Sequence, residues 1–220
     1  MDLASVFYLC SFNAGFTKEN TNPTNLVYIL NADTNTAEWA TYDQVISDWT
    51  KQYIGENKET KYKTIANKYN ARFTQVSSAP LKNIATPKIE KTKDIIIGDL
   101  RHISLYITSQ RNVNRLEIYT NYIEIEKALI NNIPIDDTFL KLNPKKNLEK
   151  RLITHYISNN EYTEIDITIV KGKKLELTLY EALNDLLNNP LFTIAKRPEN
   201  QISKPFVLND AILVTKTITF

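Results

Sequence analysis

The residue types that most often do chemistry are scarce in this chain. His102 and His155 are its only histidines, and Cys10 is its only cysteine. A zinc site with nitrogen and carboxylate ligands usually draws on two or three histidines at close spacing. These two histidines are isolated on separate predicted strands, without an H-x-D or H-E-x-x-H motif beside either. The sequence therefore predicts strand-face or loop histidines, and no metal site within these residues.

Other catalytic signatures are missing as well. The chain has no G-x-S-x-G turn for a serine nucleophile, no glycine-rich phosphate loop, and no histidine next to Cys10 that would activate its thiol. Carboxylate pairs such as Asp136-Asp137 and Glu124/Glu126 would need a cleft to act as general acid and base. Such pairs are also common on loops and solvent faces. We therefore predict no catalytic residues in this chain.

The candidate binding residues are Trp39, Tyr42, Asp43 and Trp49. Aromatic side chains can stack on the apolar faces of sugars, and the chain is rich in them, with 12 tyrosines and 2 tryptophans. Core packing is the competing interpretation: a buried tryptophan pair, with Asp43 as the N-cap of a helix. The sequence leaves both interpretations open.

These candidates lie in the most regular stretch of the chain, Asn25 to Gly55. Alternating apolar residues and a run of Asn, Asp and Thr predict a strand, a turn and a second strand: Leu26–Leu30, Asn31–Thr36 and Ala37–Tyr42. From about Tyr42, the spacing of Val45, Ile46, Trp49 and Tyr53 predicts a helix with one apolar face, which ends at Gly55. If this helix folds back on the hairpin, the two tryptophans meet.

From Pro87 onward the apolar residues recur mostly with a period of two. Glu164–Val170 and Lys174–Leu179 flank the turn signal Lys171-Gly172 and are predicted to pair as a hairpin, and Glu181–Asn188 is predicted as a short helix. Short strands at roughly ten-residue spacing, without long helices between them, exclude a parallel α/β fold. The predicted fold is mainly β: an antiparallel β-sandwich with one or two short helices.

The predicted organisation has three parts. Residues 1–16 are the tail of a transmembrane helix or an N-terminal strand, since Leu3–Phe16 is apolar but too short to cross a bilayer. Residues 17–86 form a subdomain of hairpin and helix. Residues 87–220 form the β-sandwich, and the two prolines between Ser77 and Pro87 suggest a boundary inside one continuous domain.

Composition narrows the classes of partner. The chain has 220 residues, 42% of them hydrophobic and 24% charged, as in an ordinary soluble globular protein. Its net charge of +2 is too small to indicate nucleic acid, and the basic run Lys141–Arg151 lies in a predicted loop with few aromatic residues. A single cysteine excludes an internal disulfide and leaves the cellular compartment open.

Three stretches resemble one known family. They are the hairpin and helix with Trp39, Tyr42-Asp43 and Trp49-Thr50, the segment RNVNRLEIY (Arg111–Tyr119), and FTIAKRPENQISKPFVLNDAILV (Phe192–Val214). Together they are similar to the C-terminal domain of the multi-pass zinc aminopeptidases of metallopeptidase family 28, which include the endoplasmic-reticulum metallopeptidase and its bacterial relatives. In that family a zinc peptidase domain comes first, a block of transmembrane helices follows, and a β-rich domain ends the chain.

The resemblance implies a location and a role. The β-rich domain would lie on the non-cytoplasmic side of a membrane, which is the periplasm in a bacterium, and residues 1–16 would be the exit end of the last transmembrane helix. The zinc-binding His, Asp and Glu motifs of the family are missing from this sequence. The chain would then be a non-catalytic accessory domain, without zinc of its own, that caps the peptidase domain, recruits substrate or assists assembly.

The expected partners of such a domain are the peptidase domain and transmembrane region of the same parent chain. Membrane contact would occur only through the N-terminal helix, with no nucleic acid bound and the oligomeric state left open. The alternative function is a free-standing β-sandwich module that binds carbohydrate or peptide, which the aromatic content favours.

Overall fold

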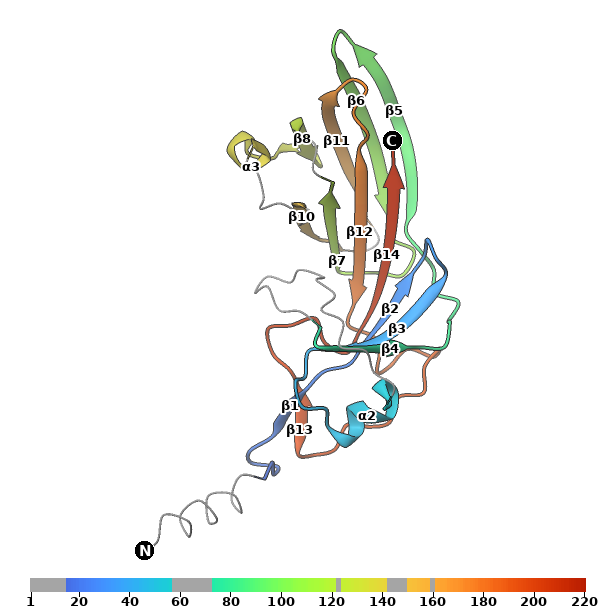
Figure 1. The fold of residues 1–220 in the computed structure, drawn as a ribbon, viewed down its shortest axis with the longest axis vertical. Helices are drawn as coiled ribbons and strands as arrows, with labels where there is room; N and C mark the ends of the chain where they lie inside the picture. Colours follow the sequence, from blue (N-terminus) through green and yellow to red (C-terminus); the bar gives the residue numbers. More distant parts are fainter. Residues whose placement is uncertain (1–14, 57–72, 122–123, 142–149, 159–160) are drawn as a thin grey trace, which may run out of the picture. The chain divides into compact units, whose positions relative to one another are not determined.

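A computed structural model describes residues 15–56, 73–121, 124–141, 150–158 and 161–220 (Figure 1). Cys10 and nearly all of the predicted N-terminal segment 1–16 lie outside the described residues. The chain forms two compact units: unit 1 comprises Met1–Tyr28, Glu38–Ala79 and Asn184–Ala211, and unit 2 comprises Ile29–Ala37, Pro80–Leu183 and Ile212–Phe220. Both units draw on residues from each side of the predicted boundary between residues 86 and 87.

One sheet of unit 2 has five antiparallel strands in the order β5-β6-β11-β8-β9. Their bounds are β5 (Lys88–Ile97), β6 (Leu100–Thr108), β8 (Ile125–Ile130), β9 (Ile133–Pro134) and β11 (Tyr162–Val170). Two turns of this sheet have a left-handed backbone. Gly98 has φ 61°, and Asn131 and Asn132 have φ 48° and 63°, a left-handed conformation that glycine and asparagine tolerate best.

A second sheet contributes four neighbouring antiparallel strands to unit 2, in the order β10-β7-β12-β14. Their bounds are β7 (Arg115–Thr120), β10 (Lys150–Tyr156), β12 (Glu176–Leu183) and β14 (Ala211–Thr219). The residues that β12 pairs with β14 include Leu177 and Leu179, which are fully buried. Alternate residues of this sheet therefore point to one apolar face.

The core of unit 2 lies between the two sheets. Its buried side chains come from β6, β8 and β11 on one side and from β7, β10 and β12 on the other, with Leu140 of helix α3 (Asp137–Lys141) at the margin. Central members are Ile103, Leu105, Ile107, Leu116, Ile118, Ile165, Ile167, Leu177 and Leu179. Two antiparallel sheets with a shared apolar interior form a β-sandwich, so the predicted fold class is confirmed.

In the part of unit 1 that the structure describes, short strands are combined with one helix. β1 (Asn22–Thr24) pairs in parallel with β13 (Gln201–Ser203), and β4 (Gln75–Ser78) pairs with residues Glu38–Thr41 of β3 (Thr36–Thr41). The helix is α2 (Asp48–Ile54). It ends at Gly55, as predicted, where φ is 69° and the amide donates to the Lys51 carbonyl.

The predicted strand, turn and strand before this helix are confirmed. β2 (Val27–Asn31) and β3 are neighbours in their sheet. Between them, the Asn31 side-chain oxygen accepts hydrogen bonds from the amides of Asp33 and Thr34. Asn35 has φ 53°. The run of Asn, Asp and Thr therefore forms this turn through local side-chain bonds and left-handed backbone.

The prediction that Asp43 caps the helix is wrong. The N-cap is Ser47, whose backbone is extended and whose hydroxyl accepts the Thr50 amide at 3.2 Å. Asp43 is used elsewhere, since its carboxylate accepts the Asn25 amide and the Lys204 ammonium. The helix therefore begins several residues later than predicted, and Val45, which the prediction places on its apolar face, is 86% exposed.

Two predictions for the C-terminal half are also wrong. The strands β11 and β12 do not pair, because β11 has β6 and β8 as neighbours while β12 lies between β7 and β14 in the other sheet. The predicted helix Glu181–Asn188 begins inside β12, where residues 181–183 pair with Val214–Ile212. Pairing on both edges of β12 outweighs the helix propensity of the Glu-Ala-Leu sequence.

We expect Ser47→Ala to lower the free energy of unfolding of unit 1 by about 1 kcal/mol, because the first turn of α2 loses its side-chain acceptor. Urea titrations followed by tryptophan fluorescence measure this change, since Trp49 lies in the helix. The matched control is Val45→Ala, which is expected to change stability by less than about 0.5 kcal/mol. A large loss for Val45→Ala and none for Ser47→Ala would favour the earlier helix start.

Candidate functional site

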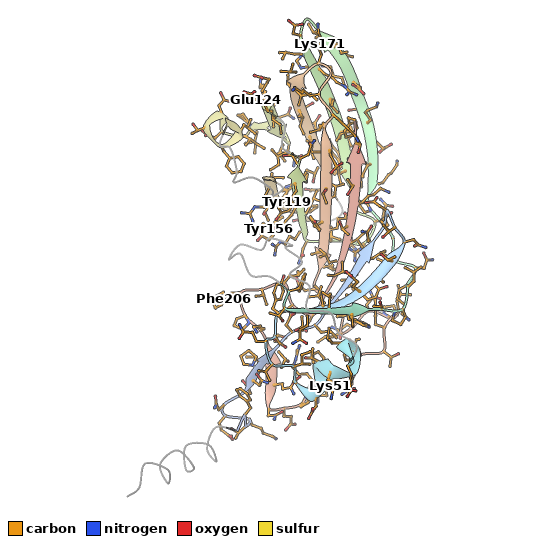
Figure 2. All side chains as sticks on the ribbon, viewed as in Figure 1. Lys51, Tyr119, Glu124, Tyr156, Lys171 and Phe206 are labelled. Carbon is orange, nitrogen blue, oxygen red and sulfur yellow. The ribbon has the colours of Figure 1, made fainter. Side chains whose placement is uncertain are left out.

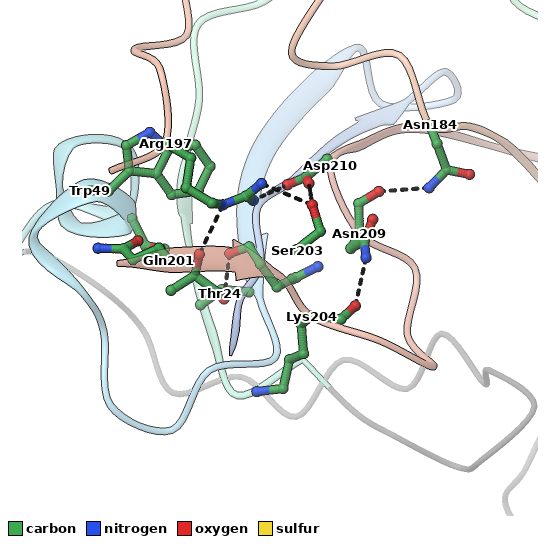
Figure 3. A network of polar contacts seen from close by, with 12 residues as sticks. Thr24, Trp49, Asn184, Arg197, Gln201, Ser203, Lys204, Asn209 and Asp210 are labelled. Atoms are coloured by element: carbon green, nitrogen blue, oxygen red, sulfur yellow. Dashed lines mark hydrogen bonds and ion pairs between the residues drawn. The ribbon is translucent and has the colours of Figure 1, made fainter. Parts of the chain in front are cut away.

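A buried ion pair lies in unit 1. Arg197 Nη2 is 2.6 Å from Asp210 Oδ1, and the two side chains are 11% and 9% exposed. The Arg197 Nε and Nη1 atoms donate to the hydroxyls of Thr24 and Ser203 at 3.0 and 2.9 Å. Ser203 in turn donates to Oδ2 of Asp210 at 2.5 Å. Figure 3 shows the result: each nitrogen of the guanidinium has its own oxygen partner.

Helix α2 supplies the aromatic cover of this pair. The Arg197 guanidinium carbon lies 4.5 Å from the ring centre of Trp49, a cation–π contact that Figure 3 also shows. Trp49 Nε1 donates to the Ala195 carbonyl at 2.7 Å, and the Ala195 amide donates to the Tyr53 hydroxyl at 2.7 Å. Trp49 and Tyr53 are four residues apart and share one helix face, so the helix holds both polar groups of Ala195.

A second ion pair links the hairpin strands to the same C-terminal segment. Asp43 is 3% exposed, and its Oδ1 lies 3.0 Å from Lys204 Nζ. Its Oδ2 accepts the Asn25 amide at 3.0 Å, and the Asn25 side chain donates to the Leu208 carbonyl at 2.8 Å. We call the residues of these two linked groups the unit 1 network. They are Thr24, Asn25, Asp43, Trp49, Tyr53, Ala195, Arg197, Ser203, Lys204, Leu208 and Asp210.

The structure places all four predicted binding residues in unit 1, and all four are buried. Trp39, Tyr42, Asp43 and Trp49 are between 2% and 7% exposed. The two indoles are joined through Tyr53, whose ring centre lies 5.4 Å from that of Trp39 and 5.9 Å from that of Trp49. Tyr42 stacks on Phe73 at 4.3 Å. This burial supports the packed-core interpretation, and ligand binding by these four residues stays a prediction.

Sequence reasoning missed the other half of the network. Arg197, Ser203 and Asp210 lie inside the stretch Phe192–Val214, where the sequence analysis singles out no individual binding or catalytic residue. The partners of the network are also far apart in sequence: Asp43 and Lys204 are separated by 161 residues. A long-range pair of this kind has no local signal in the sequence.

Unit 2 contains a buried carboxyl that sequence reasoning also missed. Glu181 on β12 is fully buried, on the same strand face as the core residues Leu177 and Leu179. Burial raises the pKa of Glu181 to about 7, although the nearby Arg111 charge and a hydrogen bond with Ser109 act in the opposite direction. The sequence signal for this buried carboxyl is the alternation of Leu177, Leu179 and Glu181 along a strand. The helix predicted from Glu181 onward hides this alternation.

This carboxyl predicts a pH-dependent stability. Below its ordinary pKa of 4.5, Glu181 is protonated in both states, and above about 7 it is ionised in both. Between these values the folded state holds a proton that the unfolded state has released, so stability falls as pH rises. At about 1.4 kcal/mol per pH unit, the expected loss between pH 4.5 and pH 7 is about 3 kcal/mol.

Urea titrations across this pH range, followed by far-ultraviolet circular dichroism, measure the loss in unit 2, which contains neither tryptophan. Glu181→Gln cannot ionise, so its stability should not show this part of the pH slope. Glu126→Gln, on the exposed side of β8, is the matched control, and its stability should fall with rising pH as that of the wild type does. An unchanged slope in Glu181→Gln would contradict the assignment of the slope to this residue.

The histidines are on strands, as predicted. His102 Nδ1 on β6 is 3.0 Å from the Thr168 hydroxyl, and His155 Nδ1 on β10 is 3.0 Å from the Thr163 hydroxyl. Burial lowers the pKa of His155, and the Glu161 carboxylate opposes that shift. Among the residues that the structure describes, no three His, Cys, Asp or Glu side chains form a group that could hold a metal ion. Neither of the helices in the described ranges has the length and apolar character needed to span a bilayer.

A polar and aromatic face lies on the side of β7, β10 and β12 opposite the core. Glu117 is paired there with Arg115 at 2.7 Å, and Thr154 donates to the same carboxylate. The rings of Tyr119 and Tyr180 meet edge to face at 5.4 Å. Burial, with a smaller contribution from Glu117, raises the pKa of Tyr119 above its ordinary value. Tyr156, which Figure 2 labels, lies opposite Arg115 in the register of β10 and β7, and its side chain is 68% exposed.

Comparison with protein-family models, with curated proteins and with solved structures finds no match to this chain. A function therefore has to be inferred from its own residues and contacts.

Proposed function

We propose that this chain is a non-catalytic accessory domain of a membrane-anchored, zinc-dependent aminopeptidase, on the non-cytoplasmic side of the membrane. Its role is to cap the peptidase domain, to recruit substrate or to assist assembly. Zinc and the reacting groups belong to the peptidase domain of the same parent chain in this proposal.

One observation carries the proposal: two of the stretches that resemble the family are bonded to each other in unit 1, to which most of their residues belong. The first is the hairpin and helix, Leu26 to Gly55, and the second is Phe192 to Val214. They are joined by the bond from Trp49 to Ala195, the contact of Trp49 with Arg197, and the ion pair of Asp43 with Lys204. The resemblance therefore falls on residues that build a folded unit, as expected of a shared scaffold domain.

The mainly β fold also agrees with the β-rich terminal domain that the resemblance implies. Within these stretches, Asp43 and Trp49 are buried and bonded to Lys204 and Ala195, so the role of these residues is structural: they connect the helix and the C-terminal segment. An accessory domain needs such a scaffold, and it needs no nucleophile or metal ligand of its own.

The proposal is tested with the longer reading frame that it requires. Zinc content and release of N-terminal amino acids from peptides are measured for this chain alone and for the protein encoded by the full frame. Zinc and activity are expected only in the longer protein. Zinc-dependent aminopeptidase activity of this chain alone, or a gene whose frame has no upstream hydrophobic helices, would overturn the proposal.

The three possible roles of the domain can be distinguished in the longer protein by enzyme kinetics, zinc content and oligomeric state. Arg197→Ala, which disrupts the unit 1 network, should raise KM with little change in kcat if the domain recruits substrate. It should lower kcat or zinc retention if the domain caps the peptidase. It should change the oligomeric state on size-exclusion chromatography if the domain assists assembly.

A second candidate function is binding of carbohydrate or peptide, and the face of β7, β10 and β12 favours it. There the exposed ring of Tyr156 adjoins charged residues that could orient a polar ligand. A glycan and peptide array probed with the wild type and with Tyr156→Ala tests this function. A ligand lost only in the variant supports it, and an array without signal rejects it.

A further inference from the structure

Three exposed isoleucines lie together at the end of one hairpin of unit 2. Ile95, Ile96 and Ile97 are 41%, 62% and 60% exposed, and they are the last residues of β5 before the turn at Gly98. Figure 1 shows this hairpin of β5 and β6 extending past the ends of β12 and β14. Consecutive strand residues point to opposite faces, so both faces of the sheet are apolar and uncovered here. We call Lys91–Arg101 together with Lys171–Lys174 the hairpin tip.

The hairpin tip is strongly basic around these isoleucines. Its six cationic side chains are Lys91, Lys93, Arg101, Lys171, Lys173 and Lys174, and its only carboxylates are Asp94 and Asp99. Both carboxylates are already paired, because Asp94 binds Arg101 and Lys91, and Asp99 binds Lys171. The net charge of the hairpin tip, +4 by this count, exceeds the +2 of the whole chain. The lysines at positions 91, 93, 171, 173 and 174 are exposed.

The turn after β11 belongs to the same surface. The Lys171 amide donates to the Asp99 carbonyl at 2.9 Å, and Lys171 Nζ reaches the Gly98 carbonyl at 3.5 Å. Lys171 is labelled in Figure 2 at the end of this hairpin. Two connections from different parts of unit 2 therefore present one continuous surface, with apolar side chains at its end and ammonium groups around it.

Protection of a sheet edge explains only part of this surface. β5 is the edge strand of its sheet, and lysines on an edge strand discourage pairing with another chain. That function accounts for Lys91 and Lys93. It does not account for Ile95 to Ile97, because an exposed apolar run on an edge increases the risk of aggregation unless something covers it.

We propose that the hairpin tip docks on an anionic phospholipid surface, with Ile96 and Ile97 inserted among the acyl chains and the lysines at the level of the phosphate groups. Apolar side chains ringed by cationic ones match the two layers of such a surface, hydrocarbon inside and negative charge outside. This inference does not depend on the proposed peptidase. It also differs from the expectation that only the N-terminal segment meets a membrane.

Vesicle co-sedimentation of this chain tests the proposal. One set of vesicles is phosphatidylcholine alone, and the other is phosphatidylcholine and phosphatidylserine in a two-to-one ratio. We expect binding to the anionic vesicles that decreases with added salt, and little binding to the neutral ones. Ile96→Ser/Ile97→Ser should weaken binding at least about tenfold. Replacing Lys171, Lys173 and Lys174 by glutamine should weaken it about fivefold for each charge.

Matched controls distinguish binding through the hairpin tip from nonspecific adsorption to the vesicles. Ile133→Ser changes an isoleucine that is 70% exposed at the start of β9. A triple variant with glutamine at Lys18, Lys51 and Lys196 removes the same charge from exposed positions of unit 1. Both controls should bind anionic vesicles as the wild type does. Circular dichroism of every variant verifies the fold.

Several outcomes would overturn the proposal. These are an absence of binding, equal binding to neutral vesicles, and equal losses in the control variants. A concentration-dependent dimer in analytical ultracentrifugation that disappears in Ile96→Ser/Ile97→Ser would also overturn it, since the isoleucines would then cover a second copy of the chain.

Discussion

Arg197→Ala is expected to lower the free energy of unfolding of unit 1 by about 3–5 kcal/mol, the usual loss when one partner of a buried ion pair is removed. The variant leaves the Asp210 carboxylate buried with Ser203 as its remaining partner. It also removes the charge beneath the Trp49 ring. Both tryptophans of the chain lie in unit 1, so urea titrations followed by tryptophan fluorescence report on this unit alone.

The surface pair of Lys18 and Glu199 is the matched control for this variant. Its side chains are 69% and 64% exposed, so Lys18→Ala should cost less than about 1 kcal/mol. Arg197→Ala/Asp210→Asn should cost less than the sum of the two single changes, because neither charge then remains unpaired. Additive losses, or a small loss for Arg197→Ala, would show that the pair does not stabilise the unit.

Trp49→Ala is expected to lower the free energy of unfolding of unit 1 by about 3–5 kcal/mol, since it leaves a cavity in a well-packed region. Trp49 is 2% exposed, contacts Tyr53 and Arg197, and donates its indole hydrogen bond to Ala195. The fluorescence of Trp39 remains available to follow unfolding. Trp49→Phe keeps an aromatic ring but loses the indole donor, and should cost less.

The same variant separates the two interpretations of the predicted binding residues. Core packing requires the large loss of stability just described. If Trp49→Ala instead remains as stable as the wild type and loses a glycan or peptide that the wild type binds, the tryptophan has a binding role. The stability measurement therefore distinguishes a structural from a functional indole even before a ligand is identified.

The fold class could be predicted because it depends on local patterns. Alternation in Glu164–Val170 predicts a strand wherever that strand pairs, and the asparagines of Asn31–Thr36 form their turn with their own backbone. The pairing partners of a strand, by contrast, cannot be predicted from its local pattern. The alternation in Lys174–Leu179 fits a hairpin with β11 as well as a strand of the opposite sheet. The hairpin is excluded only because β6 and β8 already occupy both edges of β11.

The candidate site was harder to predict for the same reason. Trp39 and Trp49 could be found because aromatic residues near a turn and a helix signal a core. The sequence indicates Asp43 as a helix cap, because an Asp shortly before a helix often caps it. Its ion-pair partner in the structure is Lys204, which is distant in sequence. The ion pair of Arg197 and Asp210 depends on contacts with β1 and α2 that no local pattern encodes.

The assembly of each unit from three separate stretches has a consequence for biosynthesis. Neither unit can complete its folding while its last stretch is still in the ribosome; these stretches are Asn184–Ala211 in unit 1 and Ile212–Phe220 in unit 2. The Thr217 amide, for example, donates to Asp33, a residue made 184 positions earlier. Such non-local contacts slow folding and leave strand edges open meanwhile. We therefore expect the nascent chain to be a client of chaperones until nearly all of it has emerged.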